Sequence, residues 1–263
     1  GVRTAGPPRS ASRRTRAAGS TGLTRWWSNP ASRVRRRSSS WPHPVWATSS
    51  GGKSLLLPTP YAIKMALLDI VCRSEGVAKA KDAWPQIAAL QLAIKGPERV
   101  VVSNTFTKIL KPRRGSPTPG SADAGPLQKS IGFREYVYHD GTIALGLEVA
   151  ETADVDRMVG WLLQVNYLGK RGGLMQLLAP PGVMDELPED FTVINLDQAT
   201  EIPIGGVVQP MDDTGPKVSF AKVDIYSGEN IRSGKDRILH HIVLPYRVVS
   251  SSRGYTLYQR FDL

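Results

Sequence analysis

A glycine-rich segment with two cations is the part of the sequence best suited to binding an anion. Gly169, Lys170, Arg171, Gly172 and Gly173 follow one another directly. Glycines let the backbone approach a ligand closely, and successive backbone N–H groups can form a concave anion site. The same residues also suit a helix end at Gly169 followed by a flexible turn. We predict that the segment binds phosphate, because a strongly basic segment precedes it in the chain.

The positive charge of the chain is concentrated near its beginning. The 263 residues carry a formal net charge of +11. Residues 1–68 contain ten arginines, two lysines and no acidic residue, whereas residues 69–263 contain 22 basic and 23 acidic residues. Such a basic segment attracts polyanions through counterion release, so RNA or DNA is the first candidate partner.

Aromatic residues lie among these cations, which suits base stacking combined with phosphate contact. The competing interpretation is that the tryptophans anchor a first strand to the core. A second basic pair occurs in a long Pro/Gly/Ser-rich loop, predicted at 111–130, that could fold over RNA or a partner. The predicted RNA-binding residues are Arg33, Arg35, Arg36, Arg37, Trp41, Trp46, Lys53, Tyr61, Lys64, Arg113, Arg114, Gly169, Lys170, Arg171, Gly172 and Gly173.

Other chemistry is poorly supported by the residue patterns. Residues 50–54 look like the end of a nucleotide-binding phosphate loop, but Ala47 stands where that pattern needs glycine. Cys72 is the single cysteine, which excludes an intrachain disulfide and a zinc site of several cysteines. His240 and His241 are adjacent, so in a strand they point to opposite faces. The sequence therefore predicts no catalytic residue, no metal and no cofactor.

The elements that must position these residues alternate between strands and helices. Strands are predicted near residues 23–35, 99–110, 132–138, 142–150 and 174–178, and helices over 60–75, 82–95 and 154–167. Thr59 suits the N-cap of the first helix, and Gly76 suits its end. The residues between 138 and 142 predict a hairpin turn, which would place His139 at the surface.

The order of these elements predicts an α+β fold: a ferredoxin-like (βαββαβ, RRM-like) unit with a β-rich C-terminal extension. We predict a disordered basic tail over 1–22, the ferredoxin-like domain over 23–178, and the extension over 179–263. The extension has strand patterns near 191–196, 202–208, 217–226, 238–249 and 255–261. Residues 1–22 also fit a mistaken start, a nucleic-acid-binding arm or a transit peptide. No run approaches the ~18 apolar residues of a membrane-spanning helix.

Two of these stretches resemble the CRISPR-associated RAMP superfamily. Residues 53–68, KSLLLPTPYAIKMALL, are similar to the segment leading into the first helix of those proteins, where Pro-x-Pro precedes small and apolar residues. The glycine-rich segment at 169–173 resembles the loops by which they hold RNA, and the ferredoxin-like order is their fold. The resemblance covers about residues 53–178. In size and layout the chain most resembles the single-copy subunit that caps the five-prime handle of the guide RNA in Cascade-type (type I) complexes. The basic run before residue 53 departs from that family, which has a well-formed first strand there.

The resemblance implies a guide-RNA-binding subunit without catalytic activity, acting in antiviral defence in the prokaryotic cytoplasm. Its implied partners are the crRNA, a multi-copy backbone subunit and a large subunit, with target DNA as a further candidate and no membrane. Two alternatives stay open. One is a metal-independent endoribonuclease that processes precursor crRNA, with His43 or His139 as acid or base. The other is an organellar RNA-associated structural protein.

Overall fold

The structure, a computed structural model, is a mixed α/β fold with three antiparallel sheets. It describes residues 54–116, 120, 125–150, 153–169, 173–195 and 205–261, and the backbone alone of 25–28 and 32–33. Its strands are β1 (Arg25–Ser28), β2 (Ser32–Arg33), β3 (Gln91–Lys95), β4 (Arg99–Pro112), β5 (Leu127–Asp140), β6 (Thr142–Val149), β7 (Gly182–Met184), β8 (Thr192–Val193), β9 (Val207–Thr214), β10 (Arg237–Leu244), β11 (Tyr246–Ser251) and β12 (Tyr255–Arg260). Its helices are α1 (Pro60–Glu75), α2 (Val77–Ala89), α3 (Val155–Leu162) and α4 (Phe220–Val223).

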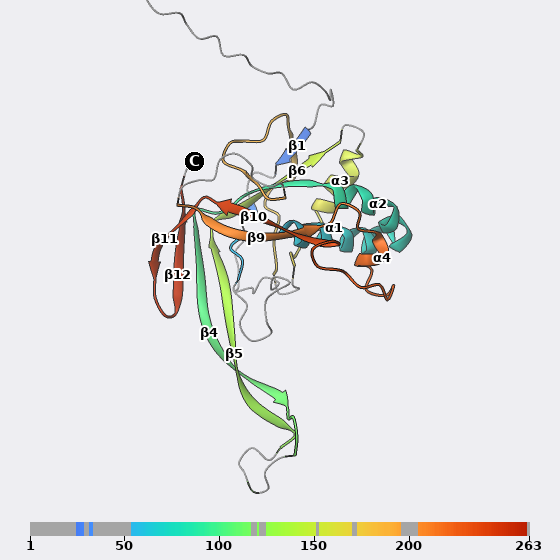
Figure 1. The fold of residues 1–263 in the computed structure, drawn as a ribbon. Helices are drawn as coiled ribbons and strands as arrows, with labels where there is room; N and C mark the ends of the chain where they lie inside the picture. Colours follow the sequence, from blue (N-terminus) through green and yellow to red (C-terminus); the bar gives the residue numbers. More distant parts are fainter. Residues whose placement is uncertain are drawn as a thin grey trace, which may run out of the picture.

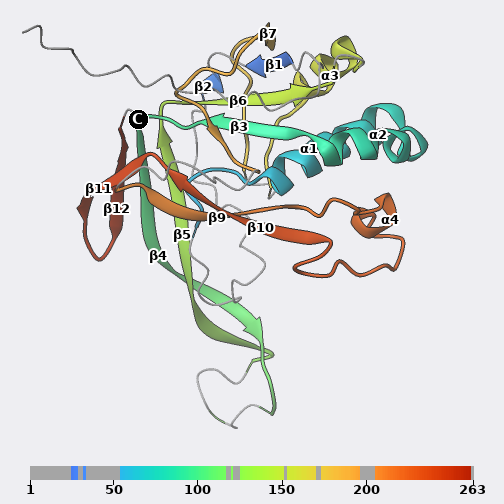
Figure 2. The ribbon, with the colours of Figure 1, turned by 45° about the horizontal axis from the view of Figure 1, so that its top comes forward.

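The first sheet has the strand order β7-β1-β6-β3-β8, with β2 paired to one end of β6. In Figure 2 the helices α1 and α2 lie between this sheet and the β9–β10 ribbon. The core between these layers contains Leu67 of α1, Ile94 of β3, Leu147 of β6 and Met211 of β9, all fully buried. The sheet and the ribbon therefore share one apolar core through the two helices.

Helix α1 forms as its flanking residues predict. The Thr59 hydroxyl accepts a hydrogen bond from the Ala62 N–H at 3.3 Å, which satisfies one of the free donors of the first turn. Pro60 occupies the first helical position, where its missing N–H costs nothing. Gly76 has a φ of 90° and ends the helix, and α2 begins at the next residue.

The third sheet has the order β11-β12-β4-β5 and continues into a projecting arm. Strand β12 pairs with β4 only from Arg99 to Ser103, whereas β4 and β5 stay paired from Arg99–Asp140 to Pro112–Leu127. Beyond the end of β12, these two strands form a long twisted hairpin that leaves the body of the molecule (Figure 1). We call residues 104–112 and 127–135 the arm.

The second predicted helix is wrong in both position and length. Helix α2 spans Val77–Ala89 and not 82–95, and its last predicted residues form the buried strand β3. Strand β3 pairs with β6 on one side and with β8 on the other. A short apolar run such as this suits a helix or a strand equally well, so only its neighbours decide which one forms.

The predicted hairpin around residues 139–141 is also wrong. Its two strands do form, as β5 and β6, but β5 pairs with β4, and β6 pairs with β1, β2 and β3. Gly141, with a φ of 125°, carries the chain from one sheet to another. A Cβ at this position would lie 3.2 Å from the Pro97 Cβ, so a side chain here would be crowded as well as strained.

Five further elements differ from prediction. The predicted loop at 111–130 is shorter, because β4 runs to Pro112 and β5 begins at Leu127. Helix α3 ends at Leu162, and within residues 174–178 only Leu174 makes a strand-type bridge, to Tyr167. Helix α4 and its turn replace the strand predicted at 217–226. The strand at 238–249 is two strands, β10 and β11.

The proposed domain limits at residues 22 and 178 stay predictions. Strands from both sides of residue 178 are paired in two sheets, since β7 joins β1, and β12 joins β4. Among the described residues, no helix has the length and apolar character needed to cross a membrane.

Candidate nucleic-acid interface

The arm exposes a face on which apolar and basic side chains alternate. In the β4–β5 register, Phe106 lies opposite Phe133, with ring centroids 5.4 Å apart. The next two pairs on this face are Lys108 with Ile131 and Leu110 with Lys129. Phe106 is 64% exposed and Ile131 is 70% exposed. Large apolar side chains rarely stay this exposed over a continuous surface unless they bind something.

The opposite face of the arm is polar and stabilises the hairpin itself. The hydroxyls of Thr105 and Thr107 donate hydrogen bonds to the Arg134 and Gly132 carbonyl oxygens at 3.0 and 3.1 Å. Ser103 donates a similar bond to the Tyr136 carbonyl oxygen at 3.3 Å. The threonines therefore reinforce the pairing of the strands, and the aromatic residues on the other face remain available to a ligand.

Positive charge is gathered on the sheet that forms the arm. Its four strands contain only two carboxylates, those of Glu135 and Asp140. The same strands hold seven cations: Arg99, Lys108, Lys111, Lys129, Arg134, Arg247 and Arg260. Since residues 69–263 are nearly neutral as a whole, this sheet is a basic region within a body that is otherwise acidic.

The predicted pair Arg113 and Arg114 lies directly beyond the end of the arm. The Arg113 N–H donates to the Pro126 carbonyl oxygen at 3.0 Å, and its side chain donates to the Gly125 carbonyl oxygen at 3.3 Å. Arg114 is exposed. Both residues stay predicted RNA ligands. They lie in the loop between β4 and β5, next to the basic arm.

Two backbone hydrogen bonds join the chain on either side of the glycine-rich segment. The Leu168 N–H donates to the Gly173 carbonyl oxygen at 3.0 Å, and the Met175 N–H donates to the Asn166 carbonyl oxygen at 2.8 Å. Gly169 has a φ of 70°, a backbone conformation that residues other than glycine rarely adopt. Lys170, Arg171 and Gly172 lie outside the described residues, so their role in phosphate binding stays a prediction.

Most of the predicted N-terminal ligands also lie outside the described residues. The backbone of Arg33 belongs to β2 and pairs with Thr142 of β6. Residues not described are Arg35, Arg36, Arg37, Trp41, Trp46 and Lys53. The structure therefore neither groups them with the arm nor separates them from it.

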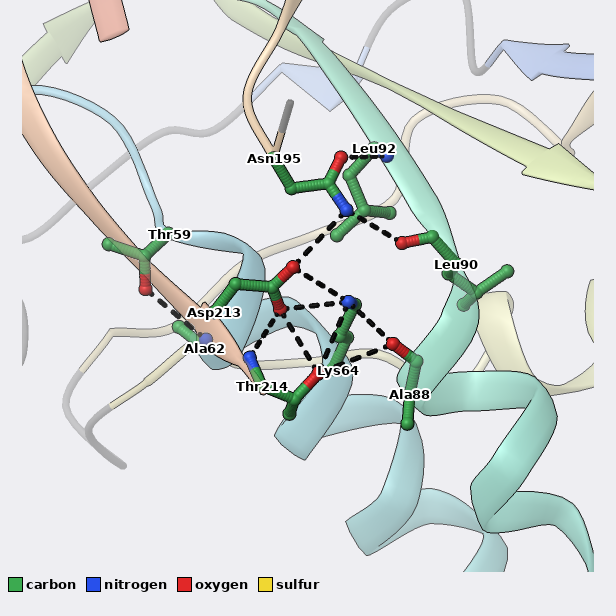
Figure 3. Close-up of polar contacts among 9 residues, drawn as sticks. All are labelled: Thr59, Ala62, Lys64, Ala88, Leu90, Leu92, Asn195, Asp213 and Thr214. Carbon is green, nitrogen blue, oxygen red and sulfur yellow. Dashed lines mark hydrogen bonds and ion pairs between the residues drawn. The ribbon is translucent and has the colours of Figure 1, made fainter. Parts of the chain in front are cut away.

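Lys64 does not belong to an RNA-binding surface, which corrects the prediction. Its side chain is 2% exposed, and its ammonium group lies 2.8 Å from the Asp213 carboxylate and 2.8 Å from the Ala88 carbonyl oxygen. Figure 3 shows this buried network, in which the Asn195 amide also donates to Asp213 at 3.2 Å. Burial lowers the pKa of Lys64, and the negative charge of Asp213 opposes that shift. The network joins α1 to the end of α2 and to β9.

Tyr61 lies one helical turn before Lys64 and already has a stacking partner. The guanidinium carbon of Arg237 is 4.2 Å from the centre of the Tyr61 ring. Arg237 also forms an ion pair with the buried carboxylate of Asp212. Burial raises the pKa of Tyr61, and the positive charge of Arg237 opposes that shift. One face of the ring is therefore occupied within the protein and is not free to stack on a base.

The histidine expected at the surface is buried instead. His139 is 1% exposed, and its Nε2 lies 2.7 Å from the Leu56 carbonyl oxygen. It lies on the inner face of β5 and contacts the segment before α1, so it has no route to an RNA phosphate. His43 lies outside the described residues. Within the described ranges, no group of three or more His, Cys, Asp and Glu side chains could hold a metal ion.

The exposed residues of the arm were missed in the sequence, although a signal for them exists. Large apolar residues recur with a period of two at Phe106 and Leu110, and again at Leu127, Ile131 and Phe133. This alternation indicates two strands facing each other across the loop. It does not say whether the apolar face is buried, which is the property that makes the arm a candidate interface.

Comparison with known proteins adds no assignment. No protein-family model matches the sequence, and no curated protein matches it significantly.

Proposed function

We propose that this chain binds single-stranded RNA as a subunit of a CRISPR Cascade-type effector. In this role it holds the five-prime end of the crRNA and contacts the multi-copy backbone subunit and the large subunit. The single observation that carries RNA binding is the arm, one face of which combines the Phe106–Phe133 ring pair with exposed aliphatic side chains and lysines. Rings of this kind stack on splayed bases while neighbouring cations contact phosphates.

The order of strands in the first sheet supports the family part of the proposal. Read across the sheet, four of its strands come in the order β7, β1, β6, β3, which are the fourth, first, third and second of these strands along the chain. Helices α1 and α2 follow the first of these strands, and α3 follows the third. This order supports the ferredoxin-like unit that we propose, in which the arm would be an insertion between the second and third strands. The membership itself, antiviral defence and a prokaryotic cytoplasmic location come from the resemblance and form part of the proposal.

The endoribonuclease alternative receives no support from the described residues. Of its two candidate histidines, His139 is buried and bonded to the backbone, which removes it as an accessible acid or base. Capture of RNA without turnover needs only stacking and phosphate contacts. The arm supplies both of them.

The decisive test separates stacking from charge on the arm. Phe106→Ala with Phe133→Ala removes the rings, and we expect the affinity for single-stranded RNA to fall by about 1–3 kcal/mol for each base that no longer stacks. Lys108→Ala with Lys129→Ala removes two cations, and we expect the salt slope to fall by about 0.7 for each phosphate that these lysines neutralise. Fluorescence anisotropy with a labelled guide RNA at several salt concentrations measures both quantities.

Tyr226→Ala is the matched control, because this tyrosine is 91% exposed and lies on the α4 turn, away from the arm. The same assay with partner subunits present tests assembly, and we expect capture to be tighter there than with the chain alone. Wild-type affinity and slope in both arm variants would refute the arm as the RNA site. Failure to assemble with backbone and large subunits would refute the Cascade part alone.

A further inference from the structure

The β11-β12-β4-β5 sheet has a second exposed face, on the side opposite the apolar face of the arm. Val100 and Val137 on its inner face are fully buried, so their neighbours Val101 and Tyr138 point outward. Tyr138 is 49% exposed and Tyr255 is 40% exposed. Tyr136 lies two residues from Tyr138 and is half-buried. We call the three outward tyrosines and the arginines that flank them the tyrosine face: Tyr136, Tyr138, Tyr255, Arg99, Arg134 and Arg247.

The strand register fixes the spacing of these rings. Ser103 of β4 lies opposite Tyr136 of β5 and also opposite Tyr255 of β12, so the three residues form one row across the sheet. Neighbouring strands are about 4.8 Å apart, which places Tyr136 and Tyr255 about 10 Å apart. Tyr138 is about 7 Å from Tyr136 along the same strand. Both spacings exceed the ~3.4 Å between stacked bases, so the face suits bases that are splayed apart.

The charges on this face favour an anionic ligand. Arg99 and Arg247 lie on the same side as the tyrosines, one row beyond Tyr138 in the register. Arg134 lies at the other end, beyond Tyr136. The Asp140 carboxylate is 2.5 Å from the Arg99 guanidinium and is therefore matched. Glu135 alternates with Tyr136 and lies on the inner face, near Ser54. Cations thus surround the rings without an unmatched carboxylate among them in these four strands.

We propose that the tyrosine face is a second binding surface for single-stranded RNA, distinct from the apolar face of the arm. The rings stack on two or three splayed bases, and the flanking arginines contact the phosphates between them. The excess of cations over carboxylates in these four strands favours a polyanion such as RNA as the occupant of this face. The surface uses residues that the arm does not use, so it stands whether or not the arm binds RNA.

The test compares loss of the rings with loss of their hydroxyl groups. We expect Tyr138→Ala with Tyr255→Ala to weaken binding of a single-stranded RNA of about twelve nucleotides by about tenfold or more. Tyr138→Phe with Tyr255→Phe keeps the stacking surfaces and is expected to bind within about twofold of wild type. Tyr226→Ala removes an exposed tyrosine elsewhere and is the control. Thermal unfolding of each variant checks that the sheet is intact.

A second measurement needs no variant. Photocrosslinking of the wild-type chain to RNA containing 4-thiouridine, followed by peptide mapping, is expected to label β5 and β12 at the tyrosines. Wild-type affinity in the alanine variant, or crosslinks confined to the arm, would overturn the proposal. If the alanine variant kept its RNA affinity but no longer bound a partner subunit, the proposal would also be overturned, and the tyrosine face would be a protein contact. Binding that depends on the tyrosines and not on Phe106 and Phe133 would refute the arm and leave this surface standing.

Discussion

The arm and the junction between α1 and β9 place lysines in opposite surroundings. Lys108 on the arm is exposed beside Ile131, on a face where cations outnumber carboxylates. Lys64 is 2% exposed, and Asp213 and the Ala88 carbonyl oxygen match its charge within 2.8 Å. The first lysine is available to a phosphate, whereas the second holds two layers of the fold together. The difference shows that burial beside a carboxylate, and not the residue type, decides which lysine has a structural role.

The junction extends this pattern to a second ion pair. Asp212 and Asp213 are adjacent in β9 and both are buried, and each is matched by a cation from another element. Arg237 of β10 pairs with Asp212 and covers one face of Tyr61. Two consecutive buried carboxylates thus determine how α1 and β10 are positioned on β9. The apolar face of the arm instead leaves Phe106 and Ile131 largely exposed, so we interpret the junction as structural and propose the arm as a binding surface.

Removal of Asp213 should give the largest effect on stability. Asp213→Ala leaves the Lys64 ammonium buried without its carboxylate, and breaking a buried pair in this way costs about 3–5 kcal/mol. Urea denaturation measures the free energy of unfolding. Lys64→Met with Asp213→Leu removes both charges and is expected to recover part of the loss. A cost below about 1 kcal/mol for Asp213→Ala would mean that the junction is not desolvated.

Removal of the arm should change stability little and weaken RNA binding strongly. We replace residues 105–134 by Asn-Gly, which removes both rings and joins Asn104 to Glu135 through a two-residue turn. Because these residues are mostly exposed, the free energy of unfolding should change by less than about 1 kcal/mol. RNA affinity should fall by about tenfold or more, because the shortened chain can no longer stack on bases or reach phosphates through the arm. Global unfolding of the shortened chain would show that the arm stabilises the body.

A single pair of substitutions compares the two lysines directly. Lys108→Ala is expected to lower the salt slope of RNA binding by about 0.7 and to change stability by less than about 0.5 kcal/mol. Lys64→Ala should leave the slope of the folded protein unchanged and destabilise it, because Asp213 is left buried without its cation. Salt titrations and urea melts on both variants give the four values. If the two variants exchanged these effects, the comparison would fail.

The smallest effect concerns the contact between α1 and α3. The Trp161 indole N–H and the Arg157 guanidinium donate to the Glu75 carboxylate at 2.6 and 2.5 Å. These hydrogen bonds lower the pKa of Glu75 below its usual value of 4.5. The stabilisation is therefore fully present above pH 4.5 and is lost as the pH falls through the folded-state pKa.

Glu75→Gln should thus cost a small amount of stability at neutral pH and less in acid, as measured by urea melts at both pH values. Glu98→Gln, at an exposed site before β4, is the control. A difference between Glu75→Gln and wild type that grows in acid would contradict the assigned cause.

Local sequence predicted the elements whose signals lie within a few residues. Thr59 and Gly76 marked the ends of α1, and both bound it as expected. The alternating residues of β4, β5 and β6 predicted strands, and those strands form. The candidate interface was harder to predict: the sequence pointed to residues before 54 and to the glycine-rich segment, whereas the exposed apolar residues of the arm were overlooked.

Tertiary structure decided which strands pair and which charges remain exposed. The turn at Gly141 looked like a hairpin, yet its two strands joined different sheets, because β5 pairs along its whole length with β4, and β6 pairs with β1 and β3 on its two sides. Lys64 looked like a surface cation until Asp213, 149 residues away, matched it. Strand pairing and charge matching are both contacts between residues far apart in the chain. Propensity and spacing determine whether a strand or a cation exists, but burial and partner choice depend on the whole fold.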